Sequence, residues 1–147
     1  MILYLDTSSL VKLYVVEPGS GDVQRAVERA ELVSTSVVAY AETCAALARR
    51  RREKSLTPTG HRRARAAFED DWPRLLTLEV AEPLARRAGD LAERHRLRGF
   101  DALHLACYLT VVEEFAGEEV RFSAADHALE RAARRAAAVG RSASGRR

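Results

Sequence analysis

The sequence has no long apolar run, and none of its apolar stretches approaches the length needed to span a bilayer. Met1 leads straight into a short apolar segment at residues 2–5. The basic region, apolar stretch and small-residue cleavage site of a secretory signal are all missing. These absences predict a cytoplasmic protein with no membrane partner.

Cysteine and aromatic residues are also scarce. Cys44 and Cys107 fit no metal-binding spacing, and each lies among small apolar residues, which predicts two buried, reduced thiols. Aromatic residues make up 6% of the chain and lie inside apolar patterns. The sequence therefore lacks an aromatic platform on which single-stranded bases could stack.

Charge is abundant and nearly balanced. The net charge is +3, but the basic residues cluster in runs at residues 49–52, 62–65 and 145–147. Such runs can contact phosphates, meet an acidic partner segment or simply face water, and the sequence leaves these alternatives open.

Short apolar segments alternate with amphipathic ones along the chain. The pattern predicts strands at residues 2–5, 32–35, 75–80 and 119–123. It predicts helices at residues 10–14, 22–30, 37–52, 58–72, 82–96, 101–115 and 126–139, the first of them capped by Ser8 or Ser9. This alternation is typical of an α/β sandwich with a mainly parallel sheet, here as one domain over residues 1–139 with a flexible basic tail at 140–147.

Four acidic residues lie where such a sheet would place a site. Asp6 lies at the carboxyl end of the first strand, which is where parallel α/β sheets bind their ligands. Asp126 follows the last strand, Asp101 opens an apolar helix, and Glu42 lies inside a helix among apolar neighbours. Three of them also have a simpler explanation, since Asp101 and Asp126 could cap helices and Glu42 could pair with an arginine, whereas Asp6 at a strand end is the hardest to explain in this way.

Convergence of these acids would favour metal chemistry. Four carboxylates in one pocket repel one another unless a divalent cation holds them, and Mg²⁺ and Mn²⁺ prefer such oxygen ligands. A cation bound in this way can orient and deprotonate a water that attacks a phosphodiester. The acids therefore predict a hydrolytic site that needs no serine or cysteine nucleophile.

Four segments carry a family resemblance: DTSSLVKLY at residues 6–14, SVVAYAE at 36–42, RGFDALHLA at 98–106 and FSAADHAL at 122–129. In this order they resemble the motifs of PIN-domain ribonucleases, especially VapC-type toxins of toxin–antitoxin modules. The resemblance extends from residue 1 to about residue 139. It implies a PIN-like three-layer sandwich whose central sheet has about four to five strands flanked by helices.

The resemblance also implies an activity and a site. The activity is Mg²⁺- or Mn²⁺-dependent endoribonuclease cleavage by a toxin that a VapB-type antitoxin inhibits, in a chain that forms a homodimer. The implied catalytic acids are Asp6, Glu42, Asp101 and Asp126. Asp6 and Asp101 are the expected direct metal ligands, with the other two acids acting through water. Thr7 and Ser123 are expected to support the site.

Other functions stay open at this point. A haloacid-dehalogenase-like phosphatase also begins with a strand that ends in aspartate, but Ser8 stands where that family needs its second aspartate. The remaining alternatives are a non-toxin PIN nuclease of RNA processing and a non-catalytic RNA- or protein-binding PIN module. His104 could approach the acids, but we expect it to pack beside its helix and bond to backbone or water.

Overall fold

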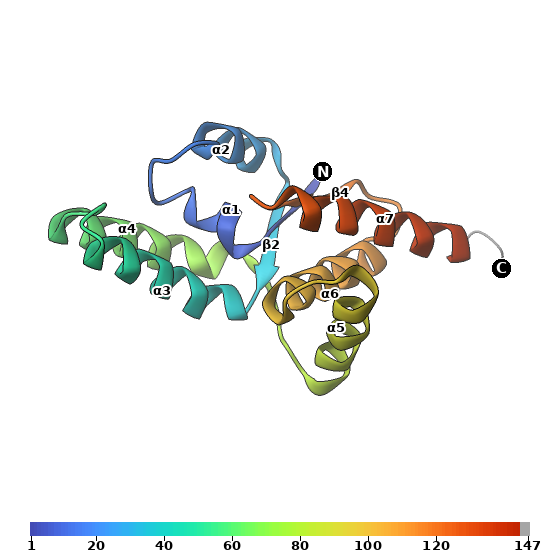
Figure 1. Ribbon diagram of the computed structural model, residues 1–147. Coiled ribbons are helices and arrows are strands. Elements are labelled where there is room, and N and C mark those ends of the chain that lie inside the picture. The colour runs from blue at the N-terminus through green and yellow to red at the C-terminus, as the bar shows by residue number, and fades with distance from the viewer. Residues whose placement is uncertain (145–147) are drawn as a thin grey trace.

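A parallel four-stranded sheet forms the centre of the protein in the computed structural model, which describes residues 1–144 (Figure 1). The strands are β1 (Ile2–Leu5), β2 (Leu32–Ser36), β3 (Leu76–Leu78) and β4 (Val120–Ser123), in the order β3-β2-β1-β4. All three neighbouring pairs are parallel. The predicted α/β class and mainly parallel sheet are confirmed.

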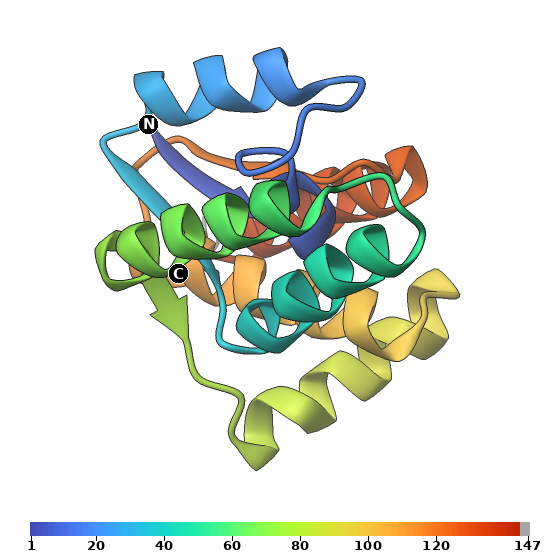
Figure 2. The same cartoon turned by 90° about the vertical axis from the view of Figure 1, so that its left-hand side faces the viewer.

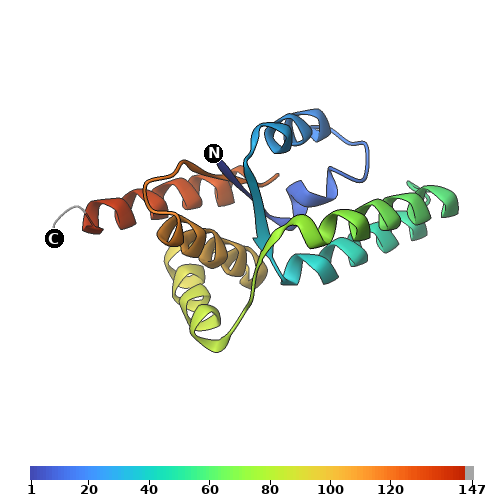
Figure 3. The ribbon, with the colours of Figure 1, turned by 180° about the vertical axis from the view of Figure 1, so that it is seen from behind.

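Helices cover both faces of this sheet. They are α1 (Thr7–Val11), α2 (Ser20–Arg29), α3 (Val38–Arg52), α4 (Pro58–Asp71), α5 (Glu82–His95), α6 (Gly99–Glu114) and α7 (His127–Ser144), with a 3₁₀ turn η1 at Trp72–Arg74. Figure 2 shows α3 and α4 side by side toward the viewer, and Figure 3 shows the chain continuing from α4 to the paired helices α5 and α6.

The central strand β1 separates two hydrophobic cores. Successive side chains of a strand point to opposite faces, so alternate residues of β1 enter different cores. Leu3 and Leu5 pack with the helices α1 to α4, whereas Ile2 and Tyr4 pack with α5 to α7. This arrangement is the predicted three-layer sandwich, and it explains why β1 is apolar along its whole length.

The parallel pairing brings all four strand ends to one edge of the sheet. Register pairs Leu5 with Ser123 and Tyr4 with Ser34, so the residues that follow β1 and β4 emerge together. Asp6 and Ala124 are the first residues past these two strands. The sheet therefore delivers Asp6 to its carboxyl edge, as the sequence predicted.

Several predicted boundaries are wrong. Helix α1 begins at Thr7 and its cap is Asp6 rather than Ser8 or Ser9, because the Asp6 carboxylate accepts a hydrogen bond from the Ser9 amide. Helix α6 begins at Gly99, two positions before Asp101. Helix α7 continues to Ser144 rather than ending at residue 139, and residues 145–147 of the expected tail lie outside the described part of the chain.

Candidate active site

A cleft of about 580 Å³ opens at the carboxyl edge of the sheet, between α1, α3 and the start of α6. Its lining combines acidic and basic side chains. The charged lining residues are Asp6, Glu17, Glu42, Arg49, Arg50, Arg52, Arg98 and Asp101. Three of the four predicted acids therefore share one cleft.

Asp6 forms the inner end of this cleft and is 5% exposed. Its carboxylate accepts hydrogen bonds from the Ser9 amide at 2.9 Å and from the Ser8 hydroxyl at 2.7 and 2.8 Å. The Ser8 hydroxyl in turn accepts from the Ala125 amide at 2.9 Å. Ser8 thus links Asp6 to the segment after β4, a role that the sequence analysis missed and that the adjacent hydroxyls in DTSS could have suggested.

Burial has an electrostatic consequence for Asp6. Loss of solvent raises the pKa of this carboxyl, and the nearby Asp101 carboxylate raises it further. The hydrogen bonds from Ser8 and Ser9 and the neighbouring His104 act in the opposite direction but do not cancel the rise. A carboxylate in this position gains from any cation that enters the cleft.

Glu42 is held by two side chains from other elements. The Thr7 hydroxyl donates to its Oε1 at 2.6 Å, and His104 Nε2 lies 3.0 Å from the same oxygen. Burial by itself would raise the pKa of Glu42, but the hydrogen bonds from His104 and Thr7 outweigh it and hold the pKa below its usual value. Glu42 is therefore kept as a carboxylate that faces the cleft.

His104 connects this carboxylate to the core. It is 2% exposed, its Nε2 also lies 3.0 Å from the Thr7 hydroxyl, and its Nδ1 lies 3.0 Å from the hydroxyl of Tyr4. Burial raises the pKa of Tyr4, and its phenol and both ring nitrogens of His104 form one hydrogen-bonded network with Thr7 and Glu42. The expectation that His104 bonds to backbone or water is wrong.

Asp101 projects from the first turn of α6 into the same cleft. Arg98 caps this helix, and its Nε donates to the Asp101 carboxylate at 3.1 Å. Asp101 is the third residue of the helix and is not its cap, so the simpler explanation of this residue does not hold. Its side chain is 21% exposed and remains accessible from the cleft.

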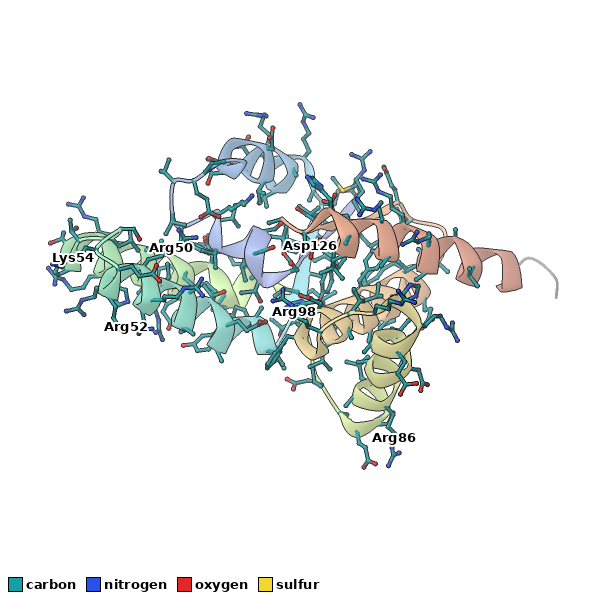
Figure 4. All side chains as sticks on the ribbon, in the orientation of Figure 1. Arg50, Arg52, Lys54, Arg86, Arg98 and Asp126 are labelled. Carbon is teal, nitrogen blue, oxygen red and sulfur yellow. The ribbon has the colours of Figure 1, made fainter. Side chains whose placement is uncertain are left out.

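Asp126 is placed differently from the other three acids. It is exposed and does not line the cleft, although its neighbour Ala125 does. Its carboxylate accepts hydrogen bonds from the Ala128 and Leu129 amides at 2.7 and 3.4 Å, which caps α7. Figure 4 shows Asp126 at the start of α7, away from Arg50 and Arg52 at the end of α3 and from Lys54 just beyond it.

Ser123 acts at the junction of β4 and α1. Its hydroxyl lies 2.9 Å from the hydroxyl of Ser9, within the first turn of α1. This contact ties the end of β4 to the turn that carries Asp6.

The metal-binding potential of the cleft lies in its oxygen donors. No group of three or more histidine, cysteine, aspartate or glutamate side chains in residues 1–144 is arranged to hold a metal ion. Both cysteines are free thiols, and burial raises the pKa of Cys107. The carboxylates of Asp6 and Asp101 in one cleft are the donor type that suits hard divalent cations.

Comparison with known proteins places this architecture in a family. The PIN domain model matches residues 3–126, which include most of β1, the cleft and β4. The chain belongs to the PIN-domain family. Within residues 1–144, this PIN domain has no helix that is both long and apolar enough to cross a membrane.

Two curated relatives show to which branch of the PIN-domain family the chain is similar. The PIN domain is 36% identical over 110 residues to Ribonuclease VapC45 of Mycobacterium tuberculosis, covering 75% of this chain and 76% of the relative. The values for Ribonuclease VapC49 of the same species are identical. This likeness shows membership of the VapC ribonuclease family and supports nuclease activity.

Solved structures share the fold at lower identity. Mycobacterium tuberculosis VapC20, a sarcin-ricin loop cleaving toxin, superposes with a TM-score of 0.61 at 23% identity, covering 84% of this chain and 91% of that chain. FitAcB from Neisseria gonorrhoeae superposes with the same TM-score of 0.61 at 19% identity, covering 91% of this chain and 94% of that chain. VapBC2 from Rickettsia felis, bound to a DNA fragment from its promoter, superposes with a TM-score of 0.54 at 11% identity, covering 84% of this chain and 100% of that chain.

Proposed function

We propose that this PIN domain is a Mg²⁺- or Mn²⁺-dependent endoribonuclease and the toxin component of a toxin–antitoxin module. The observation that carries the proposal is the shared cleft, in which Asp6, Glu42 and Asp101 lie beside four arginine side chains. These are Arg49, Arg50, Arg52 and Arg98. Carboxylates that hold a cation next to basic groups that hold phosphates are what phosphodiester hydrolysis requires.

Asp6 and Asp101 would hold the cation directly. Asp6 is buried at the end of a strand, and Asp101 lies in the first turn of a helix, so both are carried by rigid elements. Glu42 and Asp126 would act through water, and the exposed position of Asp126 suits this more distant role. Held by these residues, a divalent cation would activate a water and stabilise negative charge on the scissile phosphate.

Thr7, His104 and Ser123 would support the acids without touching the RNA. Thr7 and His104 hold Glu42 through its Oε1, and Ser123 holds the first turn of α1 through Ser9. Such partners orient ligands, and their loss typically lowers metal affinity or activity by about 10- to 100-fold.

The proposed partners follow from the relatives. The names VapC45 and VapC49, and the solved VapBC2 and FitAcB assemblies, support a VapB-type antitoxin as the inhibitor of this chain. A homodimer, a cytoplasmic location and a single functional domain over residues 1–139 belong to the same proposal.

The test is cleavage of total RNA with and without Mg²⁺ by the wild type and by the Asp6→Asn and Asp101→Asn variants. Each variant keeps the size of its side chain and removes one charge, so we expect cleavage to fall by more than about 100-fold, beyond the loss typical of an indirect partner. Asp70→Asn is the matched control, because Asp70 is exposed on α4 outside the cleft.

The cleavage ends should be mapped by sequencing, and circular dichroism should show that all variants are folded. Cleavage by either active-site variant at the wild-type rate would refute the assigned site. Cleavage that is unaffected by chelation of divalent cations would refute the metal.

A further inference from the structure

The run of four arginines at the end of α3 is divided by the phase of the helix. Arg51 is nine positions after Glu42, about two and a half turns, so it lies on the opposite side of α3. Arg49 is seven positions after Glu42, about two turns, and lies almost directly in line with it. Consistent with this phase, Arg49, Arg50 and Arg52 line the cleft and Arg51 does not.

The arginines of the cleft also differ in their partners. Arg50 is paired with Glu17, and Arg98 is paired with Asp101. Arg49 and Arg52 are exposed and have no ion pair or hydrogen-bonded side-chain partner within the residues that the structure describes. They are therefore the two cleft cations whose charge is available to a ligand.

Small side chains connect these two arginines to the acids. Ala45 and Ala46 line the cleft between Glu42 and Arg49 on the same face of α3. Because these side chains are only methyl groups, they leave room in this part of the cleft for a ligand. Along the helix axis Arg49 lies about 10 Å and Arg52 about 15 Å from Glu42, from the rise of 1.5 Å per residue.

This spacing points to a ligand with several separated negative charges. Since the two arginines follow Glu42 at about 10 and about 15 Å along the helix axis, we take them to face phosphates other than the one at the acids. Unpaired guanidinium groups bind phosphate oxygens well because of their planar array of donors. Protein recognition of RNA away from duplex grooves mostly targets single-stranded segments, which can lie along such a cleft.

We propose that Arg49 and Arg52 form a phosphate-binding subsite that holds a single-stranded RNA segment along α3, on one side of the bond to be cleaved. This subsite rests on the proposed nuclease function and extends it by setting the path of the substrate. Arg51 takes no part in it. An acidic peptide from a protein partner is the competing ligand, and the test separates the two.

The test is the salt dependence of RNA binding, measured by the anisotropy of a short fluorescein-labelled oligouridine. All proteins carry Asp6→Asn so that the probe is not cleaved, and the double variant Arg49→Ala/Arg52→Ala is compared with Arg51→Ala. Each phosphate contact to a single strand contributes about 0.7 to the slope of log K against log salt, so the double variant should lose about 1.4. Between about 50 and about 200 mM KCl, the affinity of the parent should therefore fall about sevenfold more than that of the double variant.

Arg51→Ala should leave the slope of the parent unchanged. Alanine is the best helix former, so neither substitution should unfold α3. Equal slopes for the double variant and Arg51→Ala would overturn the subsite. An unchanged slope together with weaker inhibition by a partner protein would assign the arginines to an acidic peptide instead and would also overturn it.

Cleavage kinetics give a second readout in the background with an intact Asp6. The double variant should raise KM for a cleavable RNA and leave kcat unchanged, because its arginines contact phosphates remote from the reacting bond. Equal losses in kcat and kcat/KM would refute a binding role. If the wild type cleaves no RNA while the slope still falls as expected, the nuclease proposal fails and the RNA-binding subsite stands.

Discussion

The Thr7→Val substitution removes one hydroxyl from the cluster around Glu42 and keeps the branched shape of the side chain. Glu42 Oε1 would lose the donor at 2.6 Å and keep His104 Nε2 at 3.0 Å. Threonine and valine have similar helix propensities, so the start of α1 should be little affected by the change itself. The substitution therefore removes the hydrogen bond from Thr7 to Glu42 together with the contact of the same hydroxyl with His104 Nε2.

The expected cost follows from the burial of that bond. Hydrogen bonds to charged groups contribute about 1.5–3 kcal/mol when both partners are buried. The Glu42 side chain is 28% exposed, so water can replace part of the lost interaction, and we expect a loss of about 1 kcal/mol. For a domain of this size that loss lowers Tm by about 3 °C.

The pH dependence identifies the cause. The Thr7 hydrogen bond helps to lower the pKa of Glu42, so the stability it provides is present above the unfolded-state pKa and is lost as the pH falls through the folded-state pKa. The difference in Tm between wild type and Thr7→Val should therefore be full at neutral pH and shrink in acid. In the variant, the pKa of Glu42 should rise, which carboxyl NMR titration can measure.

Thr7→Ser is the matched control, because it keeps the donor and removes only a methyl group. Thermal unfolding of both variants across the acid and neutral range, with the Glu42 titration, completes the assay. The reasoning is refuted if Thr7→Val and Thr7→Ser show the same Tm and the same Glu42 pKa.

Three further predictions concern buried side chains. Asp6→Asn should stabilise the metal-free protein at neutral pH. Burial raises the pKa of Asp6, so the stability of the wild type falls as the pH rises above the usual aspartate range. A variant that is less stable than the wild type in urea unfolding at neutral pH would contradict this. Tyr4→Phe should cost about 1–3 kcal/mol, since the buried His104 Nδ1 loses its hydrogen-bond partner. An unchanged urea midpoint would exclude that bond. Phe68→Ala should cost about 3–5 kcal/mol in the same assay, because Phe68 is fully buried against three aromatic rings, and a loss below about 1 kcal/mol would show that the site collapses.

Much of the fold could be read from local pattern. The apolar run at residues 2–5 and the alternation of strands and helices predict a parallel α/β sandwich, and Thr57 with Pro58 predicts the start of α4 correctly. Boundaries next to polar clusters were less predictable. In DTSS three hydroxyls and one carboxylate can all cap a helix, and the choice of Asp6 depends on where β1 ends.

Part of the candidate site could also be predicted from the sequence. The position of Asp6 at a strand end follows from sequence, because a strand and its end are local features, and parallel sheets bind ligands at that edge. The run of arginines is likewise visible in the sequence, and its division into cleft-facing and outward residues follows from the helix period once Glu42 is known to face the cleft.

Only the tertiary structure decided which of these residues meet. Packing of α3 and α6 on the two faces of the sheet brings Glu42 and Asp101 into one cleft with Asp6, whereas Asp126 caps α7 and lies outside that cleft. The bonds of His104 to Tyr4, Thr7 and Glu42 join four different elements. Contacts between elements distant in the chain depend on how whole faces pack, and no local pattern of residues contains that information.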